Sequence, residues 1–314
     1  MICTVTPNPS VDRTLEVAAL TPGEVLRAQG WSTDPGGKGV NVSRALHANG
    51  VPTTAVVPVG GAEGEHLAEL LAEHGVPALP VRVSEPTRNN VAVVDAAGTT
   101  TKINTPGRIT AEETEDLLRA VAGRLDARPD LLVAAGSLPE GAPVDLYARM
   151  VRAAARRGVP VAVDTSGAPL AAAVRAGSVD LLKPNEEELA ELDGQEFTTL
   201  GEVIAAARRA LAHGNRAALV TLGPHGALLV EAGQVHWAGG PAFAPRSTVG
   251  AGDCALAGYL AARGAPADRL AAAATWGRAA AALPGSAVPG PGDLDPGPVR
   301  VVADPDPDLV IKEL

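Results

Sequence analysis

The chain has 314 residues, is 46% hydrophobic and 20% charged, and carries a formal net charge of −10. This length fits one large domain, and the acidic balance argues against a nucleic-acid binder, which usually presents a basic face. No run approaches the roughly 20 apolar residues of a membrane span. The start, Met1–Thr6, lacks the regions of a signal peptide, and two cysteines are too few for a disulfide framework. We therefore expect a cytoplasmic globular enzyme that binds neither nucleic acid nor a membrane.

Short apolar runs alternate along the chain with stretches typical of helices. The predicted strands are Thr53–Val59, Leu131–Ala135, Val159–Val163, Val179–Leu182, Ala217–Leu222 and Ala227–Val230. The predicted helices are Glu65–His74, Ala111–Leu125, Val144–Arg157, Leu200–His213 and Gly252–Arg263. Continuous apolar strands separated by helices indicate a mainly parallel sheet with helices on both faces, joined by right-handed crossovers. The predicted fold is therefore a doubly wound α/β domain that covers residues 1–314.

Two segments, at about residues 11–33 and 88–106, contain β-prone sequence with no helix between the runs. The second segment predicts a hairpin of Asn90–Asp95 and Thr99–Asn104 that turns near Gly98. The first predicts another, of Thr14–Val17 and Glu24–Arg27.

If the two hairpins pair with each other, they would form a small β-sheet lid over a ligand site. The alternative is that they are ordinary edge strands and form no lid. Exposed strand edges tend to be paired or covered, which suggests a homodimer through this lid. Near the end of the chain, Pro284–Pro307 is rich in Pro, Gly and Asp and predicts a surface tail.

The most informative motif is Ser247–Cys254 (STVGAGDC), which opens an Ala- and Leu-rich helix. The small residues 250–252 let backbone N–H groups converge at a helix N-terminus, and this arrangement favours an anion. Asp253 is then either a helix cap or a general base that faces a hydroxyl while the N–H groups hold a phosphoryl group. The residues alone leave both interpretations open.

Two more motifs combine a turn with polar side chains. In Asp34–Ala45 (DPGGKGVNVSRA), glycines precede a helix that carries Lys38 and Asn41, although the spacing is not that of a Walker motif. In Leu181–Leu189 (LLKPNEEEL), Asn185 and Glu188 would share one helical face, where their oxygen atoms suit a hydrated Mg²⁺. The structural alternative to a Mg²⁺ site is that the acidic residues only stabilise the helix N-terminus electrostatically.

Three further loops, beginning at Gly136, Asp164 and Thr221, follow predicted strands. These loops would lie at the carboxyl ends of the strands, where doubly wound sheets bind their ligands. The sequence contains no H-E-x-x-H pattern or Cys/His cluster and no G-x-S-x-G elbow, which argues against a metallohydrolase and an esterase.

Together these motifs resemble the PfkB-type, ribokinase-like carbohydrate kinases, and within them the 1-phosphofructokinase and tagatose-6-phosphate kinase branch. The shared motifs run in family order from about residue 4 to 290. They are N-P-S-V-D at 8–12, G-G-K-G-x-N-V at 36–42, T-R-x-N at 87–90, G-S-L-P at 136–139, K-P-N-x-x-E at 183–188 and S-T-V-G-A-G-D at 247–253. The resemblance implies a ribokinase-like core with a β-sheet lid, and phosphorylation of a sugar hydroxyl that uses ATP and Mg²⁺.

The resemblance also implies residue roles. Asp253 would be the general base, and the amides of Gly250, Ala251 and Gly252 would form the anion hole. The residues implied for the sugar phosphate are Asp12, Gly37, Lys38, Asn41, Arg88, Asn90 and Arg27. Those implied for the nucleotide are Lys183, Asn185, Thr221, Gly223, Gly226 and Thr248, with Glu188 holding Mg²⁺ through water and Ala281–Ser286 bordering the adenine pocket.

Arg88 and Lys38 beside the acceptor indicate a substrate that already carries a phosphate, because an arginine fork binds phosphate in a bidentate manner. The predicted reaction converts fructose 1-phosphate and ATP to fructose 1,6-bisphosphate and ADP. Kinases of tagatose 6-phosphate or fructose 6-phosphate are the alternative. A protein of another class, a regulator that binds a phosphosugar without turnover, is disfavoured by Asp253 and the intact glycine turn. A nicotinamide-dependent oxidoreductase is disfavoured because its glycine fingerprint is absent.

Overall fold

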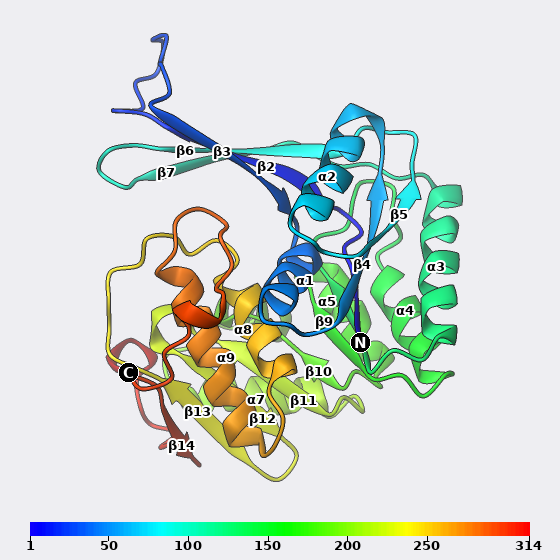
Figure 1. Ribbon diagram of the computed structural model, residues 1–314. Helices are drawn as coiled ribbons and strands as arrows, with labels where there is room; N and C mark the ends of the chain where they lie inside the picture. Colours follow the sequence, from blue (N-terminus) through cyan, green and yellow to red (C-terminus); the bar gives the residue numbers. More distant parts are fainter.

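The computed structural model describes residues 1–314 and contains one large and one small sheet (Figure 1). The strands of the large sheet are β1 (Ile2–Val5), β4 (Thr53–Val59), β5 (Ala78–Arg82), β8 (Leu131–Ala135), β9 (Val161–Asp164), β10 (Leu181–Leu182), β11 (Ala217–Thr221), β12 (Ala227–Glu231), β13 (Val235–Gly239) and β14 (Arg300–Ala303). Their order is β14-β13-β12-β11-β10-β9-β8-β1-β4-β5. In this order, every neighbouring pair between β11 and β5 is parallel. The pairs β11–β12, β12–β13 and β13–β14 are antiparallel. The predicted α/β fold is confirmed. It differs from the prediction at one edge, where the last three strands are antiparallel rather than joined by parallel crossovers.

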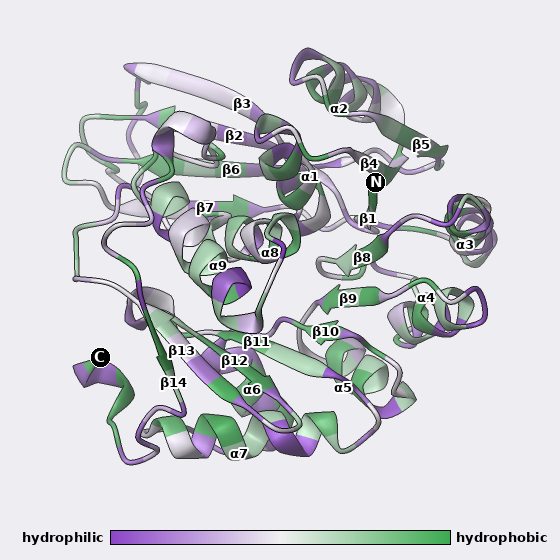
Figure 2. Cartoon of the chain, turned by 60° about the horizontal axis from the view of Figure 1, so that its bottom comes forward, coloured by the Kyte–Doolittle hydropathy of each residue, from purple (hydrophilic) through white to green (hydrophobic).

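Helices cover both faces of the large sheet. They are α1 (Lys38–Ala48), α2 (Gly61–Glu73), α3 (Ala111–Asp126), α4 (Leu146–Ala155), α5 (Gly167–Ala176), α6 (Glu186–Asp193), α7 (Leu200–Leu211), α8 (Ala251–Ala261) and α9 (Pro266–Ala281). Figure 2 shows the apolar strands β8 to β12 between α8 and α9 on one side and α5 and α7 on the other. Burial of apolar strand surface on both faces is the main source of stability for this layer arrangement. None of the helices is both long enough and apolar enough to cross a bilayer.

The small sheet consists of β2 (Ser10–Glu16), β3 (Gly30–Gly36), β6 (Arg88–Val94) and β7 (Thr100–Asn104), in the order β3-β2-β6-β7. It extends across one end of the molecule, above α8 and α9 in Figure 1, and we call it the lid. The lid sheet predicted from two inserted segments is therefore confirmed.

One lid hairpin differs from its prediction. Because Ser10 pairs with Gly36 and Glu16 with Gly30, the segment 17–29 becomes a long connection. Glu24–Arg27 lies in that connection and forms no strand, since β3 occupies the only edge of β2 that is not paired with β6. The β6–β7 hairpin turns at Gly98, where φ is 83°, as predicted.

The segment 284–307 is more than a surface tail. Within it, β14 adds the last strand to the large sheet, where Trp237 of β13 pairs with Val302. Ser286 is 7% exposed, so this part of the segment is packed against the body of the protein. The strand forms because β13 would otherwise leave an open edge, which composition alone does not reveal.

Candidate active site

The site lies at the carboxyl ends of the parallel strands. The chain leaves β1 toward β4 on one side and later returns to β8 on the other, so the strand order reverses there. Ligand sites of doubly wound sheets form at such a switch point. Asp164 ends β9, Lys183 follows β10 and Thr221 ends β11, which places three polar side chains along this edge.

Asp253 lies in the first turn of α8 and is 7% exposed. Its Oδ2 accepts a hydrogen bond of 2.8 Å from Nδ2 of Asn41, which α1 supplies. Burial, together with the negative charge of Asp164, raises the pKa of Asp253 to about 7. The charges of Lys183 and Lys38 and the hydrogen bond from Asn41 act in the opposite direction. A buried carboxyl group that titrates near neutral pH is suited to accept a proton.

The start of α8 has the geometry of an anion site. Gly250 adopts a left-handed conformation, with φ at 74°, before the first helical residue. A Cβ atom at Gly252 would lie 3.4 Å from the Nζ of Lys183, so an ammonium group faces the first turn. The first backbone N–H groups of a helix have no acceptor within it, and a cation beside them strengthens the attraction for a phosphate. Of the amides predicted for the anion hole, that of Ala251 already donates, at 3.4 Å, to the carbonyl of Thr248.

Asp164 joins two lysines. Its side chain is fully buried; its Oδ1 accepts from the Nζ of Lys38 at 2.7 Å, and its Oδ2 lies 3.1 Å from the Nζ of Lys183. Although burial acts against the charged form, the two ammonium groups hold the pKa of Asp164 below its usual value. Asp164 follows a predicted strand, but no role was predicted for it from the sequence. A carboxylate directly after the apolar run Val161–Val163 is the signal that points to it.

Asn185 and Glu188 form a reciprocal helix cap. The Oδ1 of Asn185 accepts from the backbone N–H of Glu188 at 2.7 Å, and the Oε2 of Glu188 accepts from the backbone N–H of Asn185 at 2.9 Å. The Oε1 of Glu188 accepts from the Nζ of Lys38 at 3.0 Å. Both carboxylate oxygens therefore have partners. Mg²⁺ prefers oxygen ligands and retains several waters, so with both oxygens of Glu188 occupied, a contact through water is the one that this arrangement leaves available.

The residues predicted for the nucleotide gather beside this cap. The loop at Asn185 forms a parallel β-bridge with Thr221, whose backbone N–H donates to the carbonyl of Pro184 at 3.2 Å. Gly223 and Gly226 lie in the loop between β11 and β12, both with positive φ. The structure thus brings together Lys183, Asn185, Thr221, Gly223 and Gly226. Thr248 is exposed, in the segment that leads into α8.

The lid supplies the other polar cluster. Asp12 of β2 lies opposite Asn90 of β6, and the Oδ1 of Asp12 accepts from the Nδ2 of Asn90 at 2.8 Å and from the hydroxyl of Ser10 at 2.6 Å. Arg88 donates to Asn90 Oδ1 at 3.1 Å and to the carbonyl of Asn8 at 3.2 Å. Burial lowers the pKa of Arg88, and the charge of Asp12 opposes this shift. A half-buried guanidinium held in this way is ready to bind an anion.

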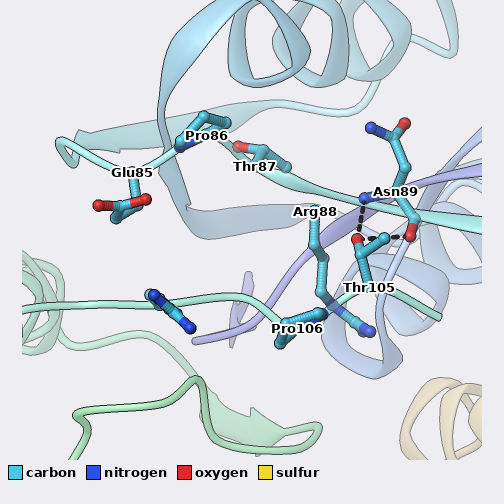
Figure 3. Close-up of a pocket in the computed structure, with 8 residues that line it drawn as sticks. Glu85, Pro86, Thr87, Arg88, Asn89, Thr105 and Pro106 are labelled. Carbon is cyan, nitrogen blue, oxygen red and sulfur yellow. Dashed lines mark hydrogen bonds between the residues drawn. The ribbon is translucent and has the colours of Figure 1, made fainter.

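Arg88 also lines an open pocket of about 280 Å³, whose wall combines charged and polar side chains with two prolines, Pro86 and Pro106. Figure 3 shows its side chain reaching toward Pro106, while Thr105 is hydrogen-bonded to the backbone of Asn89. Arg108 lines the same pocket and forms an ion pair of 2.9 Å with Glu140. The pocket therefore holds a second guanidinium besides that of Arg88.

Two residues predicted for the sugar phosphate, Lys38 and Arg27, are not hydrogen-bonded to the cluster of Asp12, Arg88 and Asn90. The hydrogen bonds of Lys38 go to Asp164 and Glu188, so it connects the start of α1 to the end of β9 and the first turn of α6. Arg27 is exposed on the connection between β2 and β3 and makes no ion pair or side-chain hydrogen bond. Gly37, with φ at 110°, leads into α1, where a Cβ atom would lie 2.6 Å from Thr6 Cγ2.

Comparison with known proteins gives a consistent result. The model of the pfkB family carbohydrate kinases matches residues 5–284. The chain is 36% identical over 259 residues to ATP-dependent 6-phosphofructokinase isozyme 2 of Escherichia coli, covering 80% of this chain and 82% of that protein. It is 37% identical over 266 residues to 1-phosphofructokinase of Xanthomonas campestris, covering 82% and 83%. The crystal structure of phosphofructokinase-2 from Escherichia coli in complex with potassium is similar with a TM-score of 0.87 and 33% identity, covering 93% of this chain and 96% of that one.

Proposed function

The chain belongs to the pfkB family of carbohydrate kinases, and within that family we propose that it is an ATP-dependent phosphofructokinase whose preferred substrate is fructose 1-phosphate. The products would be fructose 1,6-bisphosphate and ADP. The observation that carries this proposal is the buried carboxyl group of Asp253, poised near pH 7 at the N-terminus of α8 and beside Lys183. This combination supplies a proton acceptor and a phosphoryl-binding site next to each other.

In the proposed reaction, the acceptor hydroxyl loses its proton to Asp253 as its oxygen attacks the γ-phosphorus of ATP. The bond between that phosphorus and the bridging oxygen breaks, and ADP leaves with the electron pair. Oδ2 of Asp253 is hydrogen-bonded to Asn41, whereas its Oδ1 has no hydrogen bond and is free to take the proton. Positioning and charge stabilisation account for most of such a transfer, and a general base contributes about 10²–10⁴-fold.

The charge on the transferred group would be met by the first backbone N–H groups of α8 and by Lys183. Lys183 is 3% exposed and is ion-paired with Asp164, so its position is fixed before the nucleotide arrives. A fixed dipole or charge stabilises a transition state without reorganisation. Mg²⁺ held near Glu188 through water would neutralise charge on the nucleotide phosphates.

Arg88 supports a substrate that already carries a phosphate. Its guanidinium is tied to Asn90, which in turn is tied to Asp12, so one cluster joins an anion-binding group to groups that can bind sugar hydroxyls. A kinase of an unphosphorylated sugar has no use for a half-buried arginine at that point. The preference for fructose 1-phosphate rests on the motifs shared with the 1-phosphofructokinase branch. Fructose 6-phosphate is the second candidate, because relatives of that specificity are equally similar.

A kinase assay tests the proposal directly. The purified protein with Mg·ATP would be given fructose 1-phosphate, fructose 6-phosphate, tagatose 6-phosphate or fructose, and ADP release would be followed. We expect the highest kcat/KM with fructose 1-phosphate, and loss of turnover in Asp253→Ala. A preference for either 6-phosphate would retain the mechanism and change the substrate. Binding of a sugar phosphate without ADP release would instead identify a non-catalytic regulator.

A further inference from the structure

Arg44 of α1 is a buried charge beside Asn41, and the proposed reaction does not use it. Only 3% of its side chain is exposed. Its guanidinium donates to Asp34 Oδ1 at 2.9 Å and to three neutral oxygens, the carbonyls of Ser286 at 3.1 Å and Pro35 at 3.3 Å and the Oδ1 of Asn41 at 3.4 Å. Removing a charged group from water costs free energy unless well-placed hydrogen-bond and ionic partners compensate for it. We therefore ask what the buried guanidinium of Arg44 does.

The contact with Asn41 decides the orientation of its carboxamide. With Oδ1 toward the guanidinium, Nδ2 faces Asp253 and donates to it at 2.8 Å. In the flipped orientation the amide NH₂ would face the guanidinium, donor against donor, and the oxygen would face the carboxylate. Arg44 therefore favours the one orientation in which Asn41 donates to the carboxylate.

Arg44 also joins segments that are distant in sequence. Asp34 and Pro35 end lid strand β3, just before the turn into α1, and Asp34 lies opposite Asp12 in the lid. Ser286 belongs to the segment that follows α9 and is 242 residues from Arg44. One side chain thus contacts the end of the lid, the body of α1 and the segment after α9. An arginine fork presents its donors in fixed, coplanar directions, whereas the three donors of a lysine ammonium rotate about one nitrogen.

We propose that Arg44 is a positioning residue that holds the carboxamide of Asn41 in the orientation that donates to Asp253. Through its hydrogen bond to Asp34, the same guanidinium also connects lid strand β3 to Asn41. The inference rests on the proposed function, in which Asp253 accepts the proton. A hydrogen bond donated to a carboxylate favours its charged form and so keeps Asp253 able to accept a proton at neutral pH.

Other charges also act on Asp253 and must be kept constant in a test. They are Asp164 at the end of β9, Lys183 after β10 and Lys38 at the start of α1. The charge of Arg44 itself reaches the neighbouring Cys254. The substitution Arg44→Lys retains a positive charge and removes the fork, so it separates geometry from charge.

The pKa of Asp253 would be measured by carbon NMR of protein labelled at its aspartate carboxyl groups, with Asp253→Asn for assignment. The kcat–pH profile would be recorded alongside. We expect Arg44→Lys to raise the pKa of Asp253 by about one unit and to move the acidic limb of the profile equally, a tenfold change in the protonation equilibrium. Asn41→Ala should produce the same shift, and the double variant no further shift, because both act on one hydrogen bond. Arg157→Lys, which alters a distant ion pair with Asp126, is the matched control.

An unchanged pKa of Asp253 in folded Arg44→Lys would overturn the proposal. So would a shift that persists undiminished in the Asn41→Ala background, because Arg44 would then act by another route. Arg44→Gln, which also lacks the fork, is measured in parallel in case the lysine variant does not fold. If the wild type phosphorylates no sugar phosphate, the proposed function fails, whereas the NMR titration still decides whether Arg44 positions Asn41.

Discussion

Asp164 and Asp253 are two buried carboxyl groups whose pKa values are displaced in opposite directions. Asp164 is paired with Lys38 and Lys183 and its pKa is lowered. Asp253 has a neutral amide as its hydrogen-bond partner, and burial and the charge of Asp164 raise its pKa to about 7. Such a division separates a carboxylate that stays charged from one that can exchange a proton. The two lysines are ion-paired with Asp164, and neither is ion-paired with Asp253.

Asp253→Asn should lower kcat by about 10²–10⁴-fold, because the variant cannot accept the proton of the acceptor hydroxyl. KM values and the melting temperature should change little, since asparagine retains an oxygen that can accept from Asn41. Steady-state kinetics with both substrates and a thermal melt test this. Asp126→Asn, a surface carboxylate paired with Arg157, is the control. Wild-type kcat in the Asp253 variant would remove the general base from the mechanism.

Turnover should depend on pH through Asp253. Since the group acts when deprotonated, kcat should rise about tenfold per pH unit in acid and level off above its pKa of about 7. The measurement is kcat at saturating ATP and sugar phosphate across pH 5 to 9. A profile that is flat through this range would contradict the assignment of this residue as the base.

Asp164→Asn should destabilise the fold by about 3–5 kcal/mol, because it leaves the buried ammonium of Lys183 without a carboxylate. The native pKa of Asp164 lies below its usual value of 3.8. Its contribution to stability is therefore complete above that value and is lost as the pH falls through the lower native pKa. Denaturant unfolding at pH 7 and pH 3 tests both points: the difference from wild type should be large at pH 7 and smaller in acid. Equal stability at pH 7 would contradict the structural role of Asp164.

Arg88→Gln should raise the KM for the sugar phosphate by about 10–100-fold, since a charged hydrogen bond to phosphate contributes roughly 1.5–3 kcal/mol. The KM for ATP should stay within about twofold of the wild-type value, because Arg88 would not contact the nucleotide. Arg82→Gln, which removes an exposed arginine paired with Glu65, is the matched control. Equal losses for both substrates would indicate that Arg88 supports the lid rather than the phosphate.

The lid, together with the connection between β2 and β3, exposes apolar side chains that a second copy of the chain could cover. Val25 is 90% exposed, Trp31 76% and Ile103 61%. Exposed apolar groups on a sheet with free edges favour association. We expect a dimer in sedimentation velocity that Trp31→Glu shifts toward the monomer. A wild type that sediments as a monomer at high concentration would contradict association through the lid.

Local patterns predicted most of the core. Thr53–Val59 and Leu131–Ala135 are strands with the predicted bounds, because short runs of mostly apolar and β-branched residues suit strands that a covered sheet buries on both faces. The reciprocal cap of Asn185 and Glu188 matches the structural alternative that the sequence left open. Strand β14 and the true course of β3 were missed, since strand pairing at an edge depends on which neighbour is already paired.

The sequence by itself determined the layers of the fold, the lid insertions and the glycine turn before Asp253. These depend on local periodicity and on backbone conformations that only small residues adopt. Only the tertiary structure decided where each charge finds its partner. Lys38 meets Asp164 across 126 residues, and Asn41 meets Asp253 across 212. A charge buried in the interior takes whichever partner the order of the strands brings within reach, and that order is not encoded in any local pattern.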